Sequence, residues 1–306
     1  MKLNPIPLHI LLFVLNLGRL RFTRRGGRLL VPSNVVGLKR TLDLWTGIRS
    51  SRYRIGDQEV SVETCVHPSL DLVALRIESS LIASGELEAA LDFGYPELKD
   101  AAWVGDFTRT KGQATVTRHR GAGRYDFARR VDAFQYEVAL AVAPGGVVRA
   151  SGTGLALNSQ ALGVAAEVGN SFSLSERGTN VLSFVCGFSA ASLPPELPSF
   201  QQTKAASAAH WESYWATGGM IDLSGSKDPR SRELERRIVL SQFLMTAMSS
   251  GSWPSSENGL MGMKDGWYLP GNGGLLYAVA TMAAGWDGAA ERPAPGFPED
   301  GSWVVR

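Results

Sequence analysis

Apolar and polar residues alternate along much of the chain between residues 55 and 190. The clearest runs are Glu59–Val66 and Leu70–Glu78. A period of two places successive side chains on opposite faces of a strand, so each run predicts a β-strand with one buried face. The other candidate strands are 86–93, 113–119, 124–130, 135–142, 163–168 and 181–188.

Gly, Pro, Asn and Asp separate these runs at short intervals, which is typical of antiparallel strands joined by tight turns. No long helical pattern interrupts the runs, and this argues against a parallel sheet built from alternating strands and helices. We therefore expect a mainly β fold in which the strands form a large antiparallel β-sandwich.

The pattern changes after a proline-rich joint at 192–198. Residues 201–216 predict a helix, because Trp211, Tyr214 and Trp215 recur there at helical spacing. An aromatic stripe on a helix is more often packed against a core than used as a ligand platform. We therefore interpret these three residues as a core face.

A second helix is predicted at 229–248. Asp228 stands at the N-cap position, and Pro229 falls in the first turn, where its missing N–H costs nothing. Leu234 and Ile238 mark the apolar face of this helix.

The closing segment 269–306 is rich in Gly and Pro. Within it only 275–284 has a helical pattern, and that stretch is apolar on every side, so it would need a partner to bury it. The composition after Trp286 predicts a disordered tail.

The overall charge is close to balance. The 306 residues include 31 Lys and Arg against 29 Asp and Glu, and 44% of the residues are hydrophobic. These values indicate a globular protein and argue against a polyanion binder whose whole surface is basic. The segment 17–54 does carry ten Lys and Arg against one acid, Asp43. It lacks regular spacing and interleaved aromatic residues, so we interpret it as solvated strand and loop faces, with a nucleic-acid patch as the alternative.

Metal and disulfide chemistry have few candidates in this sequence. The two cysteines, Cys65 and Cys186, form no C-x-x-C motif, and only four histidines accompany them. We therefore expect no metal site and no cofactor. One disulfide and two buried free thiols are both compatible with two cysteines, so the redox compartment stays open.

The apolar run Ile10–Leu15 is shorter than the ~20 residues that a membrane span needs. Asn16, Gly18 and Arg19 follow it where a signal peptide would place small residues for cleavage. The sequence predicts no membrane span, and it decides neither the cellular location nor the oligomeric state.

No familiar catalytic motif occurs in the sequence, and a G-x-S-x-G nucleophile elbow is absent. Gly152-Thr153-Gly154 lies on a β background without the helix that phosphate binding needs, so we interpret it as a turn. Acidic pairs such as Glu86 and Glu88 fit exposed strand faces. We assign no catalytic residue on motif grounds.

Six blocks nevertheless form a recognisable series along the chain: 40–47 (RTLDLWTG), 62–78, 103–106 (WVGD), 210–240, 257–260 and 266–268 (GWY). Their order and spacing resemble those of glycoside hydrolase family 65-like proteins of the six-hairpin glycosidase superfamily. The resemblance covers residues 16–268 and is strongest at 40–106 and 205–245. It implies an antiparallel β-supersandwich followed by linker helices and an (α/α)6 barrel.

The resemblance also implies a domain organisation. Residues 16–192 would form the β-sandwich, 193–227 a helical linker, and 228–268 the first part of an incomplete (α/α)6 barrel. Residues 1–15 and 269–306 have no counterpart in the family. We expect the former to be an unmatched N-terminal segment and the latter an anomalous, disordered tail.

A carbohydrate partner and acid catalysis on a glycosidic bond follow from the same resemblance. In the family, a Glu deep in the barrel protonates the leaving oxygen, and an activated water or inorganic phosphate attacks the anomeric carbon. No residue of this chain matches that Glu, so no catalytic residue is carried over. Trp267 and Tyr268 match the start of the sugar-binding stretch and are the candidate substrate-binding residues, with loop packing as the alternative.

The family has further strands before Leu15 and most of its barrel after Tyr268. We therefore expect this chain to be a truncated, catalytically inactive product of a glycoside hydrolase or phosphorylase-like protein. The alternative is a non-catalytic β-sandwich that binds a glycan or a protein partner. The sugar, the linkage and the choice between hydrolysis and phosphorolysis depend on residues outside this chain.

Overall fold

The computed structural model describes residues 17–95, 105–150, 169–190, 192–217, 220–249 and 269–305. The described chain divides into two compact units, 17–212 and 213–305. Each unit has a hydrophobic cluster of its own.

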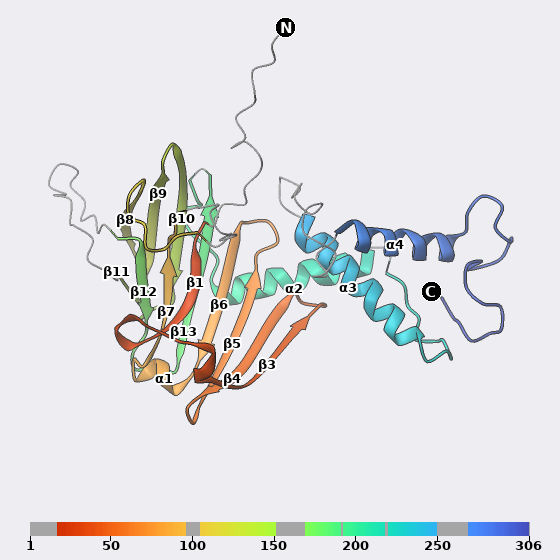
Figure 1. Cartoon of the computed structure of the whole chain (residues 1–306), viewed down its shortest axis with the longest axis horizontal. Coiled ribbons are helices and arrows are strands. Elements are labelled where there is room, and N and C mark those ends of the chain that lie inside the picture. Colours follow the sequence, from red (N-terminus) through yellow and green to blue (C-terminus); the bar gives the residue numbers. More distant parts are fainter. Residues whose placement is uncertain are drawn as a thin grey trace, which may run out of the picture. The chain divides into compact units, whose positions relative to one another are not determined.

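The first unit contains two antiparallel sheets (Figure 1). The smaller sheet has the strand order β11-β12-β7-β1-β2, and the larger has the order β3-β4-β5-β6-β13-β10-β9-β8. The strands are β1 (Arg19–Arg24), β2 (Arg28–Leu29), β3 (Val35–Asp43), β4 (Ile48–Ile55), β5 (Gln58–Val66), β6 (Leu72–Glu78), β7 (Leu87–Asp92), β8 (Gln113–Gly121), β9 (Arg124–Val131), β10 (Phe134–Val142), β11 (Val147–Ala150), β12 (Ser171–Ser175) and β13 (Val181–Ser189).

The expected antiparallel sandwich and mainly β fold are confirmed. Seven of the strands predicted from alternation correspond to β5 to β10 and β13, with ends that shift by at most a few residues. The candidate strand 163–168 lies outside the described residues. Six strands, β1 to β4, β11 and β12, were not predicted. Of these, β3 is exposed along nearly its whole length and carries no clean alternation.

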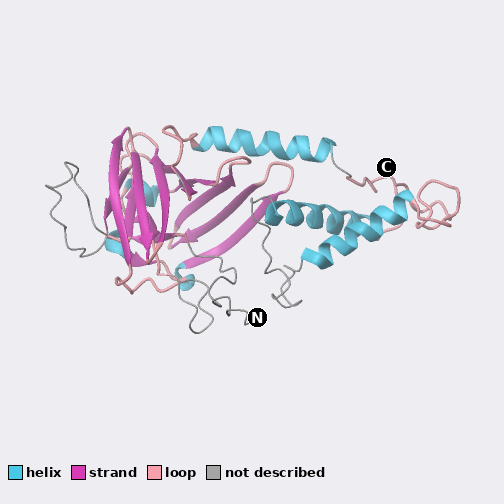
Figure 2. Cartoon of the chain, turned by 90° about the horizontal axis from the view of Figure 1, so that it is seen from above, coloured by secondary structure: helices cyan, strands magenta, loops and turns pink. Residues whose placement is uncertain are grey.

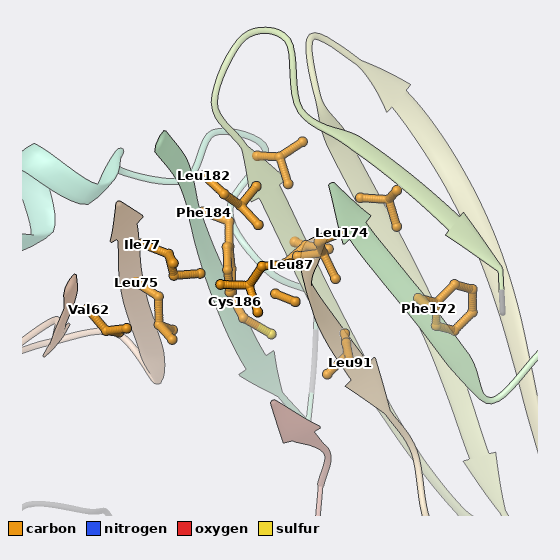
Figure 3. Close-up of a cluster of buried hydrophobic side chains, with 14 of the residues drawn as sticks. Val62, Leu75, Ile77, Leu87, Leu91, Phe172, Leu174, Leu182, Phe184 and Cys186 are labelled. Carbon is orange, nitrogen blue, oxygen red and sulfur yellow. The ribbon is translucent and has the colours of Figure 1, made fainter. Parts of the chain in front are cut away.

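The main core lies between the two sheets. Figure 3 shows side chains of β7 and β12 directed toward side chains of β6 and β13. Leu91 and Phe172 come from the smaller sheet, and Ile77, Phe184 and Cys186 come from the larger one; all five are buried almost completely. The alternation in the sequence therefore marks the sheet faces that meet in this core.

Three helical turns interrupt the sandwich: η2 (Arg25–Gly27), η3 (Pro32–Asn34) and α1 (Ser80–Ala83). Helix α2 (Phe200–Thr217) confirms the helix predicted at 201–216. It begins with a capping box, in which Ser199 Oγ accepts from the Gln202 amide and Gln202 Oε1 accepts from the Ser199 amide. Trp211 and Trp215 are both buried, as expected of a core face.

The second unit contains α3 (Ser231–Ser249) and α4 (Leu269–Ala284), which lie side by side (Figures 1 and 2). Helix α3 confirms the helix predicted at 229–248. Its apolar face contributes Ile238 to a buried cluster with Val279 and Phe297. The segment after α4, for which the composition predicted disorder, places Phe297 in this cluster at 4% exposure. Within the described residues, no helix is both long enough and apolar enough to cross a membrane.

Candidate functional site

The predicted substrate-binding residues Trp267 and Tyr268 lie outside the described residues. The described part of the chain contains no group of three or more His, Cys, Asp or Glu side chains that could bind a metal. The candidate sites described below all lie in the sandwich. Three arrangements of residues there are candidates for ligand binding or for chemistry.

The first arrangement is the turn between β3 and β4, which is part of the block 40–47. Asp43 organises this turn, because its carboxylate accepts from the Trp45 amide at 3.0 Å and from Thr46 Oγ1 at 2.7 Å. Gly47 closes the turn with φ of 68° and donates its amide to the Asp43 carbonyl at 2.8 Å. Trp45, at the tip, is 55% exposed.

Helix α2 packs directly on this turn. Ser207 Oγ donates to the Thr46 carbonyl at 2.8 Å. A Cβ added at Gly47 would overlap the ring of Trp211 and would lie 2.9 Å from Ser207 Oγ. The absence of a side chain at Gly47 therefore permits the helix to approach. The same turn also holds Trp45 at the surface. An exposed indole has a flat apolar face of the kind that packs on the C–H face of a sugar. The sequence pointed to this block through the resemblance but did not single out Trp45.

The second arrangement is a groove on the inner face of β3, β4 and β5, here called the inner groove, with a volume of about 590 Å³. Its apolar wall comes from β1, the β2–β3 connection and the inner faces of β3, β5 and β6. Its defining residues are Leu20, Phe22, Leu38, Arg40, Tyr53 and Val62.

Polar donors lie together on one side of the inner groove. In the strand register Arg40 lies opposite Ser51, and Arg49 lies opposite Thr64. Tyr53 is 8% exposed, and its hydroxyl has no hydrogen-bond partner among the described residues. Burial raises the pKa of Tyr53 to about 12, although the positive charge of Arg40 acts in the opposite direction. The hydroxyl therefore stays protonated and is a hydrogen-bond donor.

A second groove, of about 930 Å³, lies on the opposite side of the same strands. Lys39, Arg52 and Arg54 line it together with Glu59 and Glu78. Basic and acidic side chains are mixed here, in contrast to the inner groove.

The basic segment 17–54 is consequently spread over several surfaces. Arg19 and Arg21 both pair with Asp92, and Ser171 Oγ also donates to this carboxylate at 2.6 Å. Burial raises the pKa of Asp92, but the hydrogen bonds from Arg21, Ser171 and Arg19 outweigh it, so the pKa is lowered overall. This distribution agrees with the interpretation of the segment as strand faces.

The third arrangement is a buried arginine. Arg129 is 1% exposed and donates to Thr115 Oγ1 at 2.6 Å, to Asn170 Oδ1 at 2.9 Å and to Gln113 Oε1 at 2.7 Å. Its guanidinium also lies 4.6 Å from the centre of the Phe93 ring. The guanidinium is well supplied with acceptors, so we interpret Arg129 as a structural residue that connects the two sheets.

Both cysteines are free and buried. Burial raises the pKa of Cys65 to about 11 and that of Cys186 to about 12. Of the two alternatives that the sequence left open, the structure shows the free thiols, and their raised pKa values make them poor nucleophiles near neutral pH.

No protein-family model and no curated protein match the sequence. Solved structures are similar to part of the chain. A bacterial glucoamylase complexed with acarbose has a TM-score of 0.46 and 10% identity, over 75% of this chain and 35% of that one. A family GH92 inverting mannosidase from Bacteroides thetaiotaomicron has a TM-score of 0.42 and 9% identity, over 73% of this chain and 29% of that one. This chain thus spans about a third of the length of the solved structures that it matches.

Proposed function

We propose that this chain belongs to a carbohydrate-active protein of the glycoside hydrolase or phosphorylase type, of which it supplies the β-sandwich. The supporting observation is the contact between Gly47 and Trp211. These residues lie in the two blocks, 40–47 and 210–240, that carry the resemblance most strongly. They are far apart in the sequence, and Trp211 fits against the turn because residue 47 has no side chain.

The finer parts of the proposal rest on the resemblance to family 65-like proteins. The helices after the sandwich would begin an (α/α)6 barrel, and Trp267 and Tyr268 would contact the sugar. The acid that protonates the glycosidic oxygen would come from a part of the protein outside this chain. We propose that the 306-residue chain alone does not turn over a glycoside.

The first test is to sequence the transcript across the codons for Gly259 to Gly285 and beyond. We expect a longer form that encodes several hundred further residues of barrel. The longer product and the 306-residue chain would then be assayed on p-nitrophenyl glycosides, with and without inorganic phosphate. Activity of the longer product, with the short chain at the level of the blank, supports the proposal. A transcript that ends as written would instead favour the non-catalytic binding sandwich.

Trp45 provides a test on the 306-residue chain itself. We expect oligosaccharides, with acarbose among the probes, to shift the indole N–H signal of Trp45 in a saturable manner by NMR. Trp286 is the matched control, because it is 51% exposed against 55% for Trp45. Trp45→Ala should abolish the binding and Trp286→Ala should leave it intact. Equal effects of the two substitutions would contradict a sugar contact at the turn.

A further inference from the structure

We propose that the inner groove binds a small amphipathic anion, namely a carboxylate carried on an apolar chain or ring. This inference is independent of the proposed glycosidic function. It rests on the arrangement of donors, an unsatisfied hydroxyl and the composition of the groove wall.

The donors converge because of the strand register. Arg40 lies opposite Ser51, whose neighbours on the same face of β4 are Arg49 and Tyr53. Residues at diagonal positions of an antiparallel pair are ~7–8 Å apart, a distance that Arg and Tyr side chains can bridge. Arg40 therefore lies diagonal to both Arg49 and Tyr53, so an anionic group beside Arg40 has a second donor within side-chain reach on either side.

The Tyr53 hydroxyl is the observation that points to a ligand. A buried hydroxyl without a partner costs free energy, and most buried polar groups in folded proteins are satisfied. The Tyr53 side chain lines the inner groove, and its hydroxyl has no partner among the described residues. A carboxylate oxygen in the groove would accept this hydrogen bond and remove the penalty.

Charge complementarity favours an anion. Neither the Arg40 nor the Arg49 guanidinium forms a hydrogen bond or ion pair with any residue that the structure describes, and no Asp or Glu lines the groove. Both arginine side chains are exposed, so an anion from solution can approach them.

The wall next to the donors fits an apolar body. Leu20, Phe22 and Val62 form its inner part, and Leu38, which is 43% exposed, forms part of the rim. A volume of about 590 Å³ is within the usual range for small-molecule sites. The groove thus combines one cationic end with one apolar end, which matches a carboxylate on a short alkyl chain.

The test is calorimetric titration of the 306-residue chain with octanoate at low salt, with octylammonium as the probe of equal length and opposite charge. We expect saturable binding of octanoate and none of octylammonium. The double variant R40Q/R49Q should bind octanoate about tenfold more weakly or worse, since two charge-assisted hydrogen bonds are lost. Tyr53→Phe, which keeps the ring, should also weaken binding.

The matched control is K39Q/R52Q. Lys39 and Arg52 lie on the same two strands as Arg40 and Arg49, and their replacement removes the same charge. They line the second groove, on the opposite side of these strands. We expect this variant to bind octanoate as the unmodified chain does, and circular dichroism melts would verify that every variant folds. Absence of saturable binding, equal binding of the two probes, or equal loss in both double variants would each overturn the proposal.

Discussion

At the scale of single residues, Gly47 controls the packing of helix α2 on the sandwich. Its φ of 68° is unfavourable for a residue with a Cβ, and such a Cβ would overlap Trp211. We expect Gly47→Ala to lower the free energy of unfolding by about 2–4 kcal/mol, from backbone strain and overpacking together. Gly56 is the matched control, because its φ is 59° but nothing lies within 4 Å of the added Cβ. Gly56→Ala should cost only about 1 kcal/mol in a urea titration. Equal losses would exclude the steric contact.

Asp92 gives the molecule a defined sensitivity to acid. Its pKa in the folded state is lowered from 3.8, so the folded state favours the ionised carboxylate. The stabilisation is complete above the unfolded-state pKa and is lost as the pH falls through the lower folded-state value. We expect Asp92→Asn to destabilise the chain by about 2 kcal/mol at pH 7, given that the two arginines are partly exposed. As the pH falls through the lowered folded-state pKa, the difference from the unmodified chain should shrink. A difference that stays constant with pH would show that Asp92 acts through its shape alone.

At the scale of secondary-structure elements, Arg129 connects strand β9 to β8 and to Asn170, the residue before β12. Replacement by Met would leave buried acceptors on these elements without donors. We expect Arg129→Met to reduce the free energy of unfolding by about 3 kcal/mol in a denaturant titration. The neighbouring Arg130 is exposed, so Arg130→Met is the matched control and should change stability by less than about 0.5 kcal/mol. Similar losses for both would contradict the network.

The same elements explain what the sequence could predict. Strands such as β6 and β13 have one face in the core, so alternation marked them clearly. Strand β3 lies at the edge of the larger sheet, and both of its faces are largely exposed to solvent. Its sequence therefore shows no alternation of apolar and polar residues.

The inner groove could not be predicted, because it depends on a β-bulge. The register shifts between Val36 and Lys39, next to Gly37 at φ of 67°. As a result Val36 lines the second groove, on the opposite side of the strands, and Leu38 lines the inner groove, although an unbroken strand would place both on one face. The face that Arg40 takes follows from this shift, and the basic run alone does not specify it.

At the scale of the whole molecule, the two units have cores of very different size. Among the residues that the structure describes, the sandwich core joins 21 buried residues, whereas the cluster around α3 and α4 has three: Ile238, Val279 and Phe297. The free energy of unfolding grows with the apolar area removed from water. We therefore expect the unit with the smaller core to have the lower free energy of unfolding. The chain should therefore not behave as a single cooperative block.

We expect calorimetry of the 306-residue chain to show two thermal transitions, with the unit 213–305 melting first. Phe297→Ala should lower only the first transition, and Phe172→Ala only the second, because each removes a buried ring from one core. Such substitutions cost about 3–5 kcal/mol, enough to move a transition by many degrees or to abolish the weaker one. The two variants control for each other, since both delete the same side chain. A single transition that both variants lower equally would mean that the two clusters unfold as one unit.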